Sequence, residues 1–384
     1  MPLLAAGHKR TGACPTFERP VLQRDGHLVR VPLVGGAMSA SQARAIAQAA
    51  EAHGSGTIEL TNRGNLQVRG VRDDDLAAVL AQLRDVGLGH RHAAVVTVSP
   101  FAAPVEHQFR HDLLAALDDL LVDGPALAPK FTVHVDDADG GTAHRRAEAV
   151  LTPADSGWRV RVAPLGEQEV TAEEALALVV ALADACRSEG AHARVADLVT
   201  VSGVEAVRAA LPLPVRSWAP IEPLAASLSG PLGASPAPGG ARTAFGGARL
   251  GRIGPDVLTG LADLVDARPG AELRVTPWRS FAVVVPDDGG RSVHDAVHEL
   301  AALGLIVGTD DPAADVVACT GAAGCWQTEV DTLAEAERQI ARRSSGGSSL
   351  HVTGCDKRCA TRSPVACTLV GRPDGSGFDE VAAS

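Results

Sequence analysis

At 384 residues, the chain is long enough for two or three globular domains, since single domains usually span about 100 to 200 residues. Hydrophobic residues make up 46% of the chain and charged residues 21%, a composition that excludes a largely disordered protein. The formal net charge of -11 argues against nucleic acid and anionic membranes as main partners, because both require a basic surface.

The termini and the cysteines indicate a cytoplasmic protein with no membrane partner. Met1 to Arg10 lacks the apolar core of a signal peptide. The longest apolar stretch, around Ala175 to Ala185, is well short of the roughly 20 residues that a membrane helix needs. Four of the seven cysteines lie between positions 319 and 359, which is typical of a metal site and not of a secreted disulfide framework.

The first part of the chain predicts a β-α-β unit. An apolar run from His27 to Leu33 leads to a helical pattern from Ser39 to His53 and then to a strand-like run from Thr57 to Val68. The hydroxyls of Ser39 and Ser41 are typical N-caps for the helix.

The middle of the chain predicts mixed strands and helices. The expected elements are strands at 93–98, 130–136 and 158–164 and helices at 112–121 and 171–189. After them, Ser227 to Arg242 is rich in Gly, Pro, Ser and Ala and predicts a mobile or irregular linker.

The part after the linker opens in the same way as the first part. An apolar run from Gly247 to Ile253 leads to a helical stretch from Asp256 to Ala267 and then to a strand-like run from Glu272 to Val285. Thr276 in this run aligns with Thr61 in the first unit. We expect a duplication that leaves a cleft between two pseudo-symmetric α+β units, with chance resemblance of two short segments as the alternative.

The C-terminal part contains two cysteine pairs. They read Cys319-x5-Cys325 and Cys355-x3-Cys359, and four thiolates match the ligand number of a [4Fe-4S] cluster. The small, Gly-rich residues inside the first pair allow the backbone to wrap closely round such a cluster. The other elements expected here are helices at 293–303 and 329–342 and a strand at 349–353.

Two other interpretations of the cysteines exist. One is a structural zinc site, although structural zinc prefers cysteine pairs spaced x2 to x4. The other is a chance cluster of four free thiols that bind no metal.

Lys357 and Arg358 add positive charge beside the second pair, which favours the reduced form of a cluster. The isolated Cys14, Cys186 and Cys367 are expected to be small buried hydrophobic residues.

These motifs together resemble those of the sirohaem sulfite and nitrite reductases. The similarity runs from about Thr16 to Val381 and includes the cysteine spacing, the duplicated unit and the segment Thr61 to Gln67 (TNRGNLQ). Within that superfamily, Leu273–Arg279, Leu350–Cys355 and Thr368–Gly371 are similar to the pattern of the precorrin-3B synthases, oxygen-dependent monooxygenases of aerobic cobalamin biosynthesis.

The resemblance implies an α+β fold of the sirohaem nitrite/sulfite reductase type, with two pseudo-symmetric ferredoxin-like half-domains plus α+β iron–sulfur and tetrapyrrole domains. The expected boundaries are 16–85 for half-domain 1, 90–226 for the first reductase-type α+β domain, 227–242 for the linker, 243–308 for half-domain 2 and 309–384 for the [4Fe-4S]-binding domain.

The sequence departs from the reductases at the anion site. Arg63 and Lys130 stand where that family has an arginine and the first lysine of a Lys-x-Lys pair, but Thr132 replaces the second lysine and Ala94 replaces a further arginine. An Asn-Gln-Asn run is here Trp278-Arg279-Ser280. Fewer cations argue against reduction of a small oxyanion, which needs its charge neutralised.

A flat tetrapyrrole ringed by carboxylates suits the remaining residues better. The arginines would form bidentate pairs with the carboxylates, and the lysine would attract them as a point charge. The neutral side chains would form hydrogen bonds with the substrate. For each arginine alone, a solvated surface partner is the alternative. The predicted substrate-binding residues are Arg63, Asn65, Gln67, Lys130, Arg274, Thr276 and Arg279.

The precorrin-3B synthase resemblance implies O2-dependent hydroxylation of precorrin-3A beside the ring A acetate, closing a γ-lactone. It implies a mononuclear non-haem iron and a [4Fe-4S] cluster that receives electrons. No Walker A or dinucleotide-binding motif occurs, so the electrons would come from an external donor, a ferredoxin or an NADH-linked flavin reductase. Candidate iron ligands are His134, Asp136 and Asp137, with a structural hydrogen bond as the other role for His134.

Two alternative functions stay open. One is a sirohaem-dependent nitrite or sulfite reductase in which Cys359 bridges cluster and haem. The other is a non-catalytic, metal-stabilised binding protein.

Overall fold

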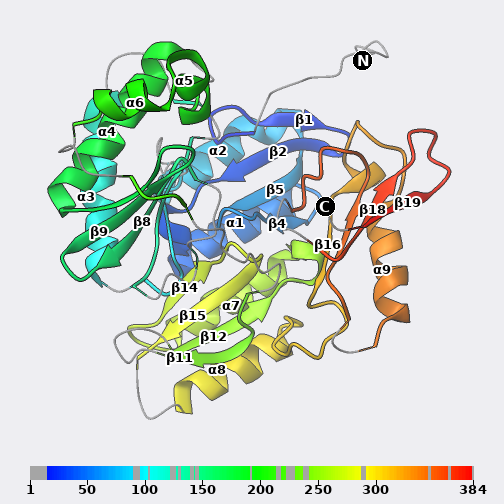
Figure 1. Cartoon of the computed structure of the whole chain (residues 1–384). Coiled ribbons are helices and arrows are strands. Elements are labelled where there is room, and N and C mark those ends of the chain that lie inside the picture. The colour runs from blue at the N-terminus through cyan, green and yellow to red at the C-terminus, as the bar shows by residue number, and fades with distance from the viewer. Residues whose placement is uncertain are drawn as a thin grey trace.

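The computed structural model of the chain has an α+β fold, as the resemblance implies (Figure 1). The central unit, cyan to green, and the C-terminal unit, orange to red, lie on opposite sides of two paired half-domains, blue and yellow. The structure describes residues 15–89, 96–102, 104–121, 127–128, 131–138, 142, 147–190, 193–212, 218–221, 230–236, 242–286, 291–344, 347–361 and 365–382.

The first half-domain is an antiparallel five-stranded sheet with two helices. The sheet order is β1 (Val21–Gln23), β2 (Gly26–Val31), β5 (Leu66–Val71), β4 (Ile58–Leu60) and β13 (Arg252–Ile253), and the helices are α1 (Ala40–His53) and α2 (Leu76–Asp85). Ser39 caps α1 as expected: its hydroxyl accepts from the Gln42 N–H at 3.2 Å, and its own N–H donates to the Gln42 side chain.

The second half-domain repeats this arrangement. The sheet order is β11 (Gly233–Pro236), β12 (Arg242–Gly247), β15 (Ser280–Val285), β14 (Glu272–Val275) and β3 (Ala37–Met38), and the helices are α7 (Pro255–Asp266) and α8 (Arg291–Ala302). Pro255 occupies the first turn of α7, where its missing N–H costs nothing. Gly233–Pro236 pair with β12, so these residues of the expected linker form a strand and are not irregular.

The two half-domains exchange short strands. β3 from the first repeat completes the second sheet, and β13 from the second repeat completes the first. Each swapped strand follows a single 3-10 turn, η1 (Val34–Gly36) or η4 (Arg249–Gly251). α1 packs against α7, and the buried residues of both repeats form one hydrophobic core. The predicted duplication is therefore confirmed as a pseudo-two-fold pair.

Each strand-like run that follows a repeat helix is a hairpin and not the single strand expected from its pattern. The first run divides into β4 and β5, and the second into β14 and β15. In the turns, the Thr61 hydroxyl accepts from the Asn65 N–H at 3.1 Å, and the Thr276 hydroxyl accepts from the Trp278 N–H at 3.2 Å. The matching threonines therefore hold matching turns.

The central unit contains a mixed five-stranded sheet with its own core. The order is β10 (Gly166–Val170), β9 (Gly157–Val162), β8 (Ala149–Ala154), β7 (Val133–Val135) and β6 (Val96–Val98), and the helices are α3 (Pro104–Leu121), α4 (Ala172–Glu189), α5 (Val195–Ser202) and α6 (Val204–Ala210). β6, β7 and β8 are parallel neighbours, so the residues that follow β6 and β7 leave the sheet at the same edge.

The C-terminal unit contains a four-stranded sheet and one described α-helix. The strands are β16 (Val316–Ala318), β17 (Leu350–Thr353), β18 (Cys367–Gly371) and β19 (Phe378–Ala382), and the helices are α9 (Thr332–Arg342) and the 3-10 turn η5 (Gly321–Ala323). β16 and β17 are parallel and connected through α9, which is a β-α-β crossover.

Candidate functional site

The four cysteines lie at one edge of the C-terminal sheet. Cys319 follows β16 directly, and Cys355 follows shortly after the parallel strand β17. Parallel strands joined by a crossover helix end at the same edge of a sheet, so the fold brings the two cysteine pairs together. The Cys319 N–H donates to the Val352 carbonyl at 3.0 Å, which fixes this register.

Backbone amides point at two of the cysteine sulfurs. The Gly354 N–H donates to Cys319 Sγ at 3.2 Å, and the Gln327 N–H donates to Cys325 Sγ at 3.4 Å. Such donors stabilise the negative charge of cluster thiolates. Gly354 has no room for a side chain, because a Cβ atom there would lie 2.4 Å from Thr328 Cγ2.

The cysteine thiols affect one another's ionisation. Burial raises the pKa of Cys325 and of Cys359, and the neighbouring cysteines raise both further. Within the described ranges, no three His, Cys, Asp or Glu side chains are arranged to hold a single metal ion. In a [4Fe-4S] cluster each thiolate binds a different iron atom, so cysteines that are close together but do not converge on one point fit a cluster.

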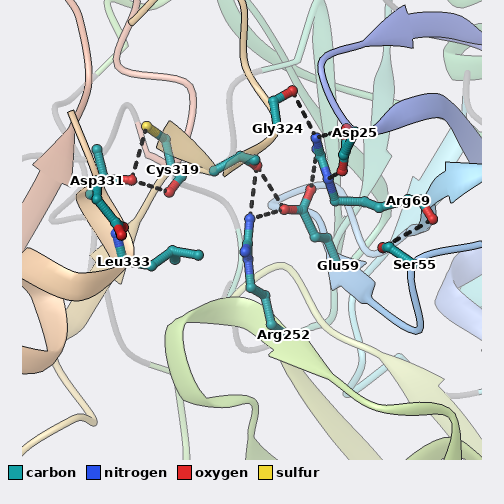
Figure 2. Close-up of polar contacts among 11 residues, drawn as sticks. Asp25, Ser55, Glu59, Arg69, Arg252, Cys319, Gly324, Asp331 and Leu333 are labelled. Atoms are coloured by element: carbon teal, nitrogen blue, oxygen red, sulfur yellow. Dashed lines mark hydrogen bonds and ion pairs between the residues drawn. The ribbon is translucent and has the colours of Figure 1, made fainter. Parts of the chain in front are cut away.

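A buried network of charges joins the Cys319–Cys325 segment, here called the cluster loop, to both half-domains (Figure 2). Glu59 on β4 accepts from Arg69 at 3.2 Å, from the Thr320 hydroxyl at 2.8 Å and from Arg252 of the second repeat. Burial alone would raise the pKa of Glu59, but the two guanidinium groups and Thr320 hold it below its usual value. The Glu59 side chain is 15% exposed, so it is a largely buried carboxylate between two cations.

Arg69 extends the network to the backbone of the cluster loop. It donates to both carboxylate oxygens of Asp25, at 2.8 and 2.9 Å, and to the Gly324 carbonyl at 3.1 Å. Its side chain is only 5% exposed, so these bonds are poorly screened by water. Arg24 also donates to the Ala322 carbonyl at 3.4 Å, so the first half-domain contacts the cluster loop at Thr320, Ala322 and Gly324.

A further basic group, Arg279, lies close to the second cysteine pair. The Arg279 guanidinium donates to the Ala360 carbonyl, just beyond Cys359. Arg279 lies in the second hairpin turn at the position that matches Gly64 in the first, and both residues have a positive φ, 58° for Arg279 and 67° for Gly64. Burial, with the charges of Arg279 and Arg358, lowers the pKa of His351 on β17 to about 4, so this imidazole is neutral at pH 7.

A pocket opens where the two hairpin turns meet the central sheet. Arg63 and Pro277 line it from the turns, and Thr97, Thr132 and His134 line it from the side of β6 and β7. This pocket is called the turn pocket below. Among its described lining residues, Arg63 alone carries a permanent positive charge.

Known proteins share this architecture. The family model described as "Nitrite/Sulfite reductase ferredoxin-like half domain" matches residues 21–86. A precorrin-3B synthase from a Sinorhizobium species is 29% identical over 394 residues, which cover 96% of this chain and 82% of the relative. The solved structure of the Mycobacterium tuberculosis NirA protein has a TM-score of 0.70 and 19% identity, covering 92% of this chain and 73% of that one.

The comparisons assign residues 21–86 to a nitrite/sulfite reductase ferredoxin-like half-domain and show that the chain has the fold of NirA. The similarity to a precorrin-3B synthase along 96% of the chain indicates an oxidoreductase. None of the helices in the described part of the chain is long and apolar enough to cross a membrane.

Two of the residues predicted to bind substrate hold the hairpin turns of this fold. Asn65 is 2% exposed, and its side-chain oxygen accepts from the Leu33 N–H at 2.9 Å. Thr276 is fully buried, and its hydroxyl bonds the Ser280 hydroxyl at 2.6 Å. Both side chains already have partners within the protein, so their first role is to shape the turns.

The other predicted residues divide between the two sides of the hairpins. Arg63 lines the turn pocket, whereas Arg279 faces the cysteines. Arg274 is 6% exposed and donates to Glu272 and to the Pro100 carbonyl at 2.8 Å. Gln67 is also buried, with its amide between Arg30 and Glu59, and Lys130 lies outside the described residues.

The candidate iron ligands are all buried beside the turn pocket. His134 is 1% exposed, and both of its ring nitrogens bond threonine hydroxyls, Thr97 at 2.9 Å and Thr142 at 2.6 Å. Asp136 accepts from the Thr142 hydroxyl and backbone, and Asp137 accepts from Ser99 at 2.6 Å. These partners leave no ring nitrogen of His134 directed at a metal.

Sequence reasoning missed the network around Glu59. Glu59 and Arg69 alternate with apolar residues, the pattern of side chains on the solvent face of a strand. Their partners Arg252 and Thr320 are 193 and 261 residues away from Glu59 in the chain, and no local pattern connects such positions.

Proposed function

We propose that the chain is a precorrin-3B synthase: it hydroxylates precorrin-3A with O2 and forms the γ-lactone, in aerobic cobalamin biosynthesis. A [4Fe-4S] cluster on Cys319, Cys325, Cys355 and Cys359 would admit electrons from an external donor. The observation that carries the proposal is the similarity to a precorrin-3B synthase along 96% of the chain.

The lining of the turn pocket supports an organic substrate over a small oxyanion. Reduction of sulfite or nitrite calls for several cations around the anion. Among the described lining residues, Arg63 is accompanied by the hydroxyls of Thr97 and Thr132 and by the imidazole of His134. One guanidinium can hold a peripheral carboxylate of a tetrapyrrole bidentately, while the hydroxyls donate hydrogen bonds.

The arrangement of the four cysteines at the edge of the C-terminal sheet supports the proposal that electrons enter through a cluster there. When bound, the cluster would supply single electrons to the site. The chain's own residues fix its position: two N–H groups point at Cys319 and Cys325, and the Glu59 network holds Thr320 and Gly324. The two half-domains therefore hold the cluster loop in one position relative to the hairpins.

The described residues do not fit a mononuclear iron. His134 has both ring nitrogens in hydrogen bonds, and no trio of ligating side chains converges anywhere in the described ranges. We therefore assign no step to such an iron.

Anaerobic purification followed by turnover tests the proposal. We expect iron and acid-labile sulfide in the ratio of a [4Fe-4S] cluster, without sirohaem. With precorrin-3A, a chemical reductant and isotopically labelled O2, the product should gain one labelled oxygen atom in mass spectrometry. Sirohaem absorption bands together with nitrite or sulfite reduction would replace this function by the reductase alternative. Zinc without sulfide would favour a metal-stabilised binding protein.

Arg63 provides a sharper test of the substrate class. Arg63→Gln should raise KM for the tetrapyrrole about tenfold or more, because a charge-assisted bidentate pair is lost. Arg63→Lys should recover only part of this affinity, since an ammonium cannot make the planar pair. Arg159→Gln, at an exposed ion pair on β9, is the matched control and should leave KM unchanged. An unchanged KM in Arg63→Gln would place the carboxylate elsewhere.

A further inference from the structure

A chain of buried polar side chains connects the interior of the central sheet to the turn pocket. His134 on β7 lies directly opposite Thr97 on the parallel strand β6, and its Nδ1 is 2.9 Å from the Thr97 hydroxyl. Its Nε2 is 2.6 Å from the hydroxyl of Thr142, which in turn contacts Asp136. Asp136 and Thr142 are both fully buried.

At the Asp136 end of this series of side chains, the hydrogen bonds determine which atoms donate and which accept. Burial on its own would raise the pKa of Asp136, but bonds and charge from His134 and Thr142 hold it below its usual value. As a carboxylate, Asp136 can only accept, so the Thr142 hydroxyl donates its single proton to it. The hydroxyl oxygen must then accept from His134, which places a proton on Nε2.

At the other end, the chain reaches the turn pocket. Thr97 and His134 both line the pocket beside Arg63. The Thr97 hydroxyl lies 3.3 Å from the Val133 carbonyl and 2.9 Å from Nδ1 of His134, so it can donate to either or accept from a protonated Nδ1. A hydroxyl with two such partners can pass a proton between the imidazole and a molecule in the pocket.

Packing alone does not account for these residues. A buried histidine bonded to two hydroxyls would be satisfied without a carboxylate. Placing Asp136 at 0% exposure is costly, and its second oxygen, Oδ2, has no hydrogen-bond partner among the described residues. Buried carboxylates that hold an imidazole in one tautomer are a recurrent feature of proton-transfer sites.

We propose that Asp136, Thr142, His134 and Thr97 form a proton relay to the turn pocket. The relay deepens the proposed function and rests on it: when one atom of O2 enters the substrate, two electrons and two protons release the other as water. The external donor supplies the electrons, and the protons come from solvent. Thr97 takes a proton from water in the turn pocket and passes its own hydroxyl proton to Nδ1 of His134, which becomes an imidazolium beside the Asp136 carboxylate. In turnover the transfer runs in reverse: Thr97 gives a proton to the oxygen atom that leaves as water and takes the Nδ1 proton, and the imidazole is left neutral with its proton on Nε2 until it is recharged for the second transfer. Asp136 is a positioning residue that keeps a proton on His134 Nε2, and Thr97 is the last link.

The first test needs no turnover. Nuclear magnetic resonance of protein labelled with nitrogen-15 at histidine reports which ring nitrogen is protonated, and His134→Gln assigns the signals by their loss. We expect Nε2 to be protonated in the unmodified protein at pH 7 and the Nδ1–H tautomer to appear in Asp136→Asn. An unprotonated Nε2, or an identical spectrum in Asp136→Asn, would overturn the relay.

The second test measures turnover. Thr97→Val keeps the shape of the side chain and removes the last hydroxyl, so kcat should fall about tenfold or more while KM changes less than about twofold. Reductant should then be consumed with peroxide release instead of product. Thr243→Val is the matched control, a buried threonine on β12 whose hydroxyl has no hydrogen-bond partner in the described chain. Equal kcat and coupling in Thr97→Val and Thr243→Val would refute proton delivery through Thr97.

The two tests separate the relay from the function. If the unmodified protein forms no product from precorrin-3A, the proposed function fails, and the tautomer of His134 alone decides the relay. If product forms and the Thr97→Val variant is as well coupled as the control, the function stands and the relay fails.

Discussion

Cys355 is placed near Cys319 by backbone geometry, because β16 and β17 are parallel and Gly354 donates from one chain segment to the sulfur of the other. Cys367 provides a comparison, since it is also half-buried but lies at the start of β18, at the opposite end of a strand parallel to β17. Both residues carry a half-buried thiol, but only Cys355 lies beside the other cysteines of the proposed cluster.

Serine substitutions at the two positions should have different effects on the cluster. Cys355→Ser should abolish the visible absorbance and sulfide content of a [4Fe-4S] protein, because serine is a poor ligand to the cluster. Cys367→Ser should retain both. Full cluster content in Cys355→Ser, measured after anaerobic purification, would show that the ligand set is wrong.

Glu59 is the residue on which the charge network depends. Glu59→Gln would leave Arg69 and Arg252 without their shared carboxylate in a buried site, and we expect a loss of about 3 kcal/mol in the free energy of unfolding. Urea unfolding of the holoprotein under anaerobic conditions measures this. Glu299→Gln breaks an ion pair with Arg268 in which Glu299 is 49% exposed, so it should cost less than about 1 kcal/mol. Equal losses in the two variants would mean that the network is not buried in solution.

The depressed pKa of Glu59 predicts a pH dependence of stability. Its value in the folded protein is below the ordinary 4.5, so its contribution is complete above pH 4.5 and is lost as the pH falls toward the folded value. The difference in unfolding free energy between the unmodified protein and Glu59→Gln should therefore be constant at neutral pH and shrink below pH 4.5. A difference that grows on acidification would have the wrong sign for a carboxylate paired in the folded state.

At the scale of elements, the sequence pattern locates helices and turns of the repeats better than it divides their strands. The run from Thr57 to Val68 alternates well enough to suggest one strand, although Gly64 at a φ of 67° marks a reversal. The cysteine spacing predicts a cluster in the C-terminal part because four thiolates occur there as two local pairs. The Glu59 network and the Thr97–Asp136 chain depend on which strands are neighbours, and only the three-dimensional topology supplies that information.

The matching turns predict matching mutational effects. Thr61→Val and Thr276→Val each remove the hydroxyl that accepts a turn N–H, so each should lower the free energy of unfolding by about 1 kcal/mol, with Thr276 the larger because it is fully buried. Thr200→Val on α5 removes only an exposed bond to the Ala196 carbonyl and serves as the control. If neither Thr61→Val nor Thr276→Val lowered the free energy of unfolding, the threonines would not be what holds the turns.

At the scale of the whole molecule, the exchange of β3 and β13 makes the half-domains parts of one folding unit. Neither five-stranded sheet is complete without a strand from the other repeat, and the two share a core that includes Ile46 of α1 and Leu258 of α7. The central unit has a separate core around residues such as Leu178. Regions that share a core open together, whereas regions with separate cores can open independently.

Hydrogen exchange distinguishes these cases. Ile46→Ala leaves a cavity at a fully buried site and should cost about 2 to 5 kcal/mol, so amide protection should fall in α7 as well as in α1. Leu178→Ala makes a comparable cavity in α4 of the central unit and should leave the protection of α7 unchanged. If protection fell in α1 but not in α7, the swapped strands would not couple the repeats. A fall in both repeats would mean that the hairpins facing the turn pocket and the cysteines keep their relative position because the half-domains fold as one.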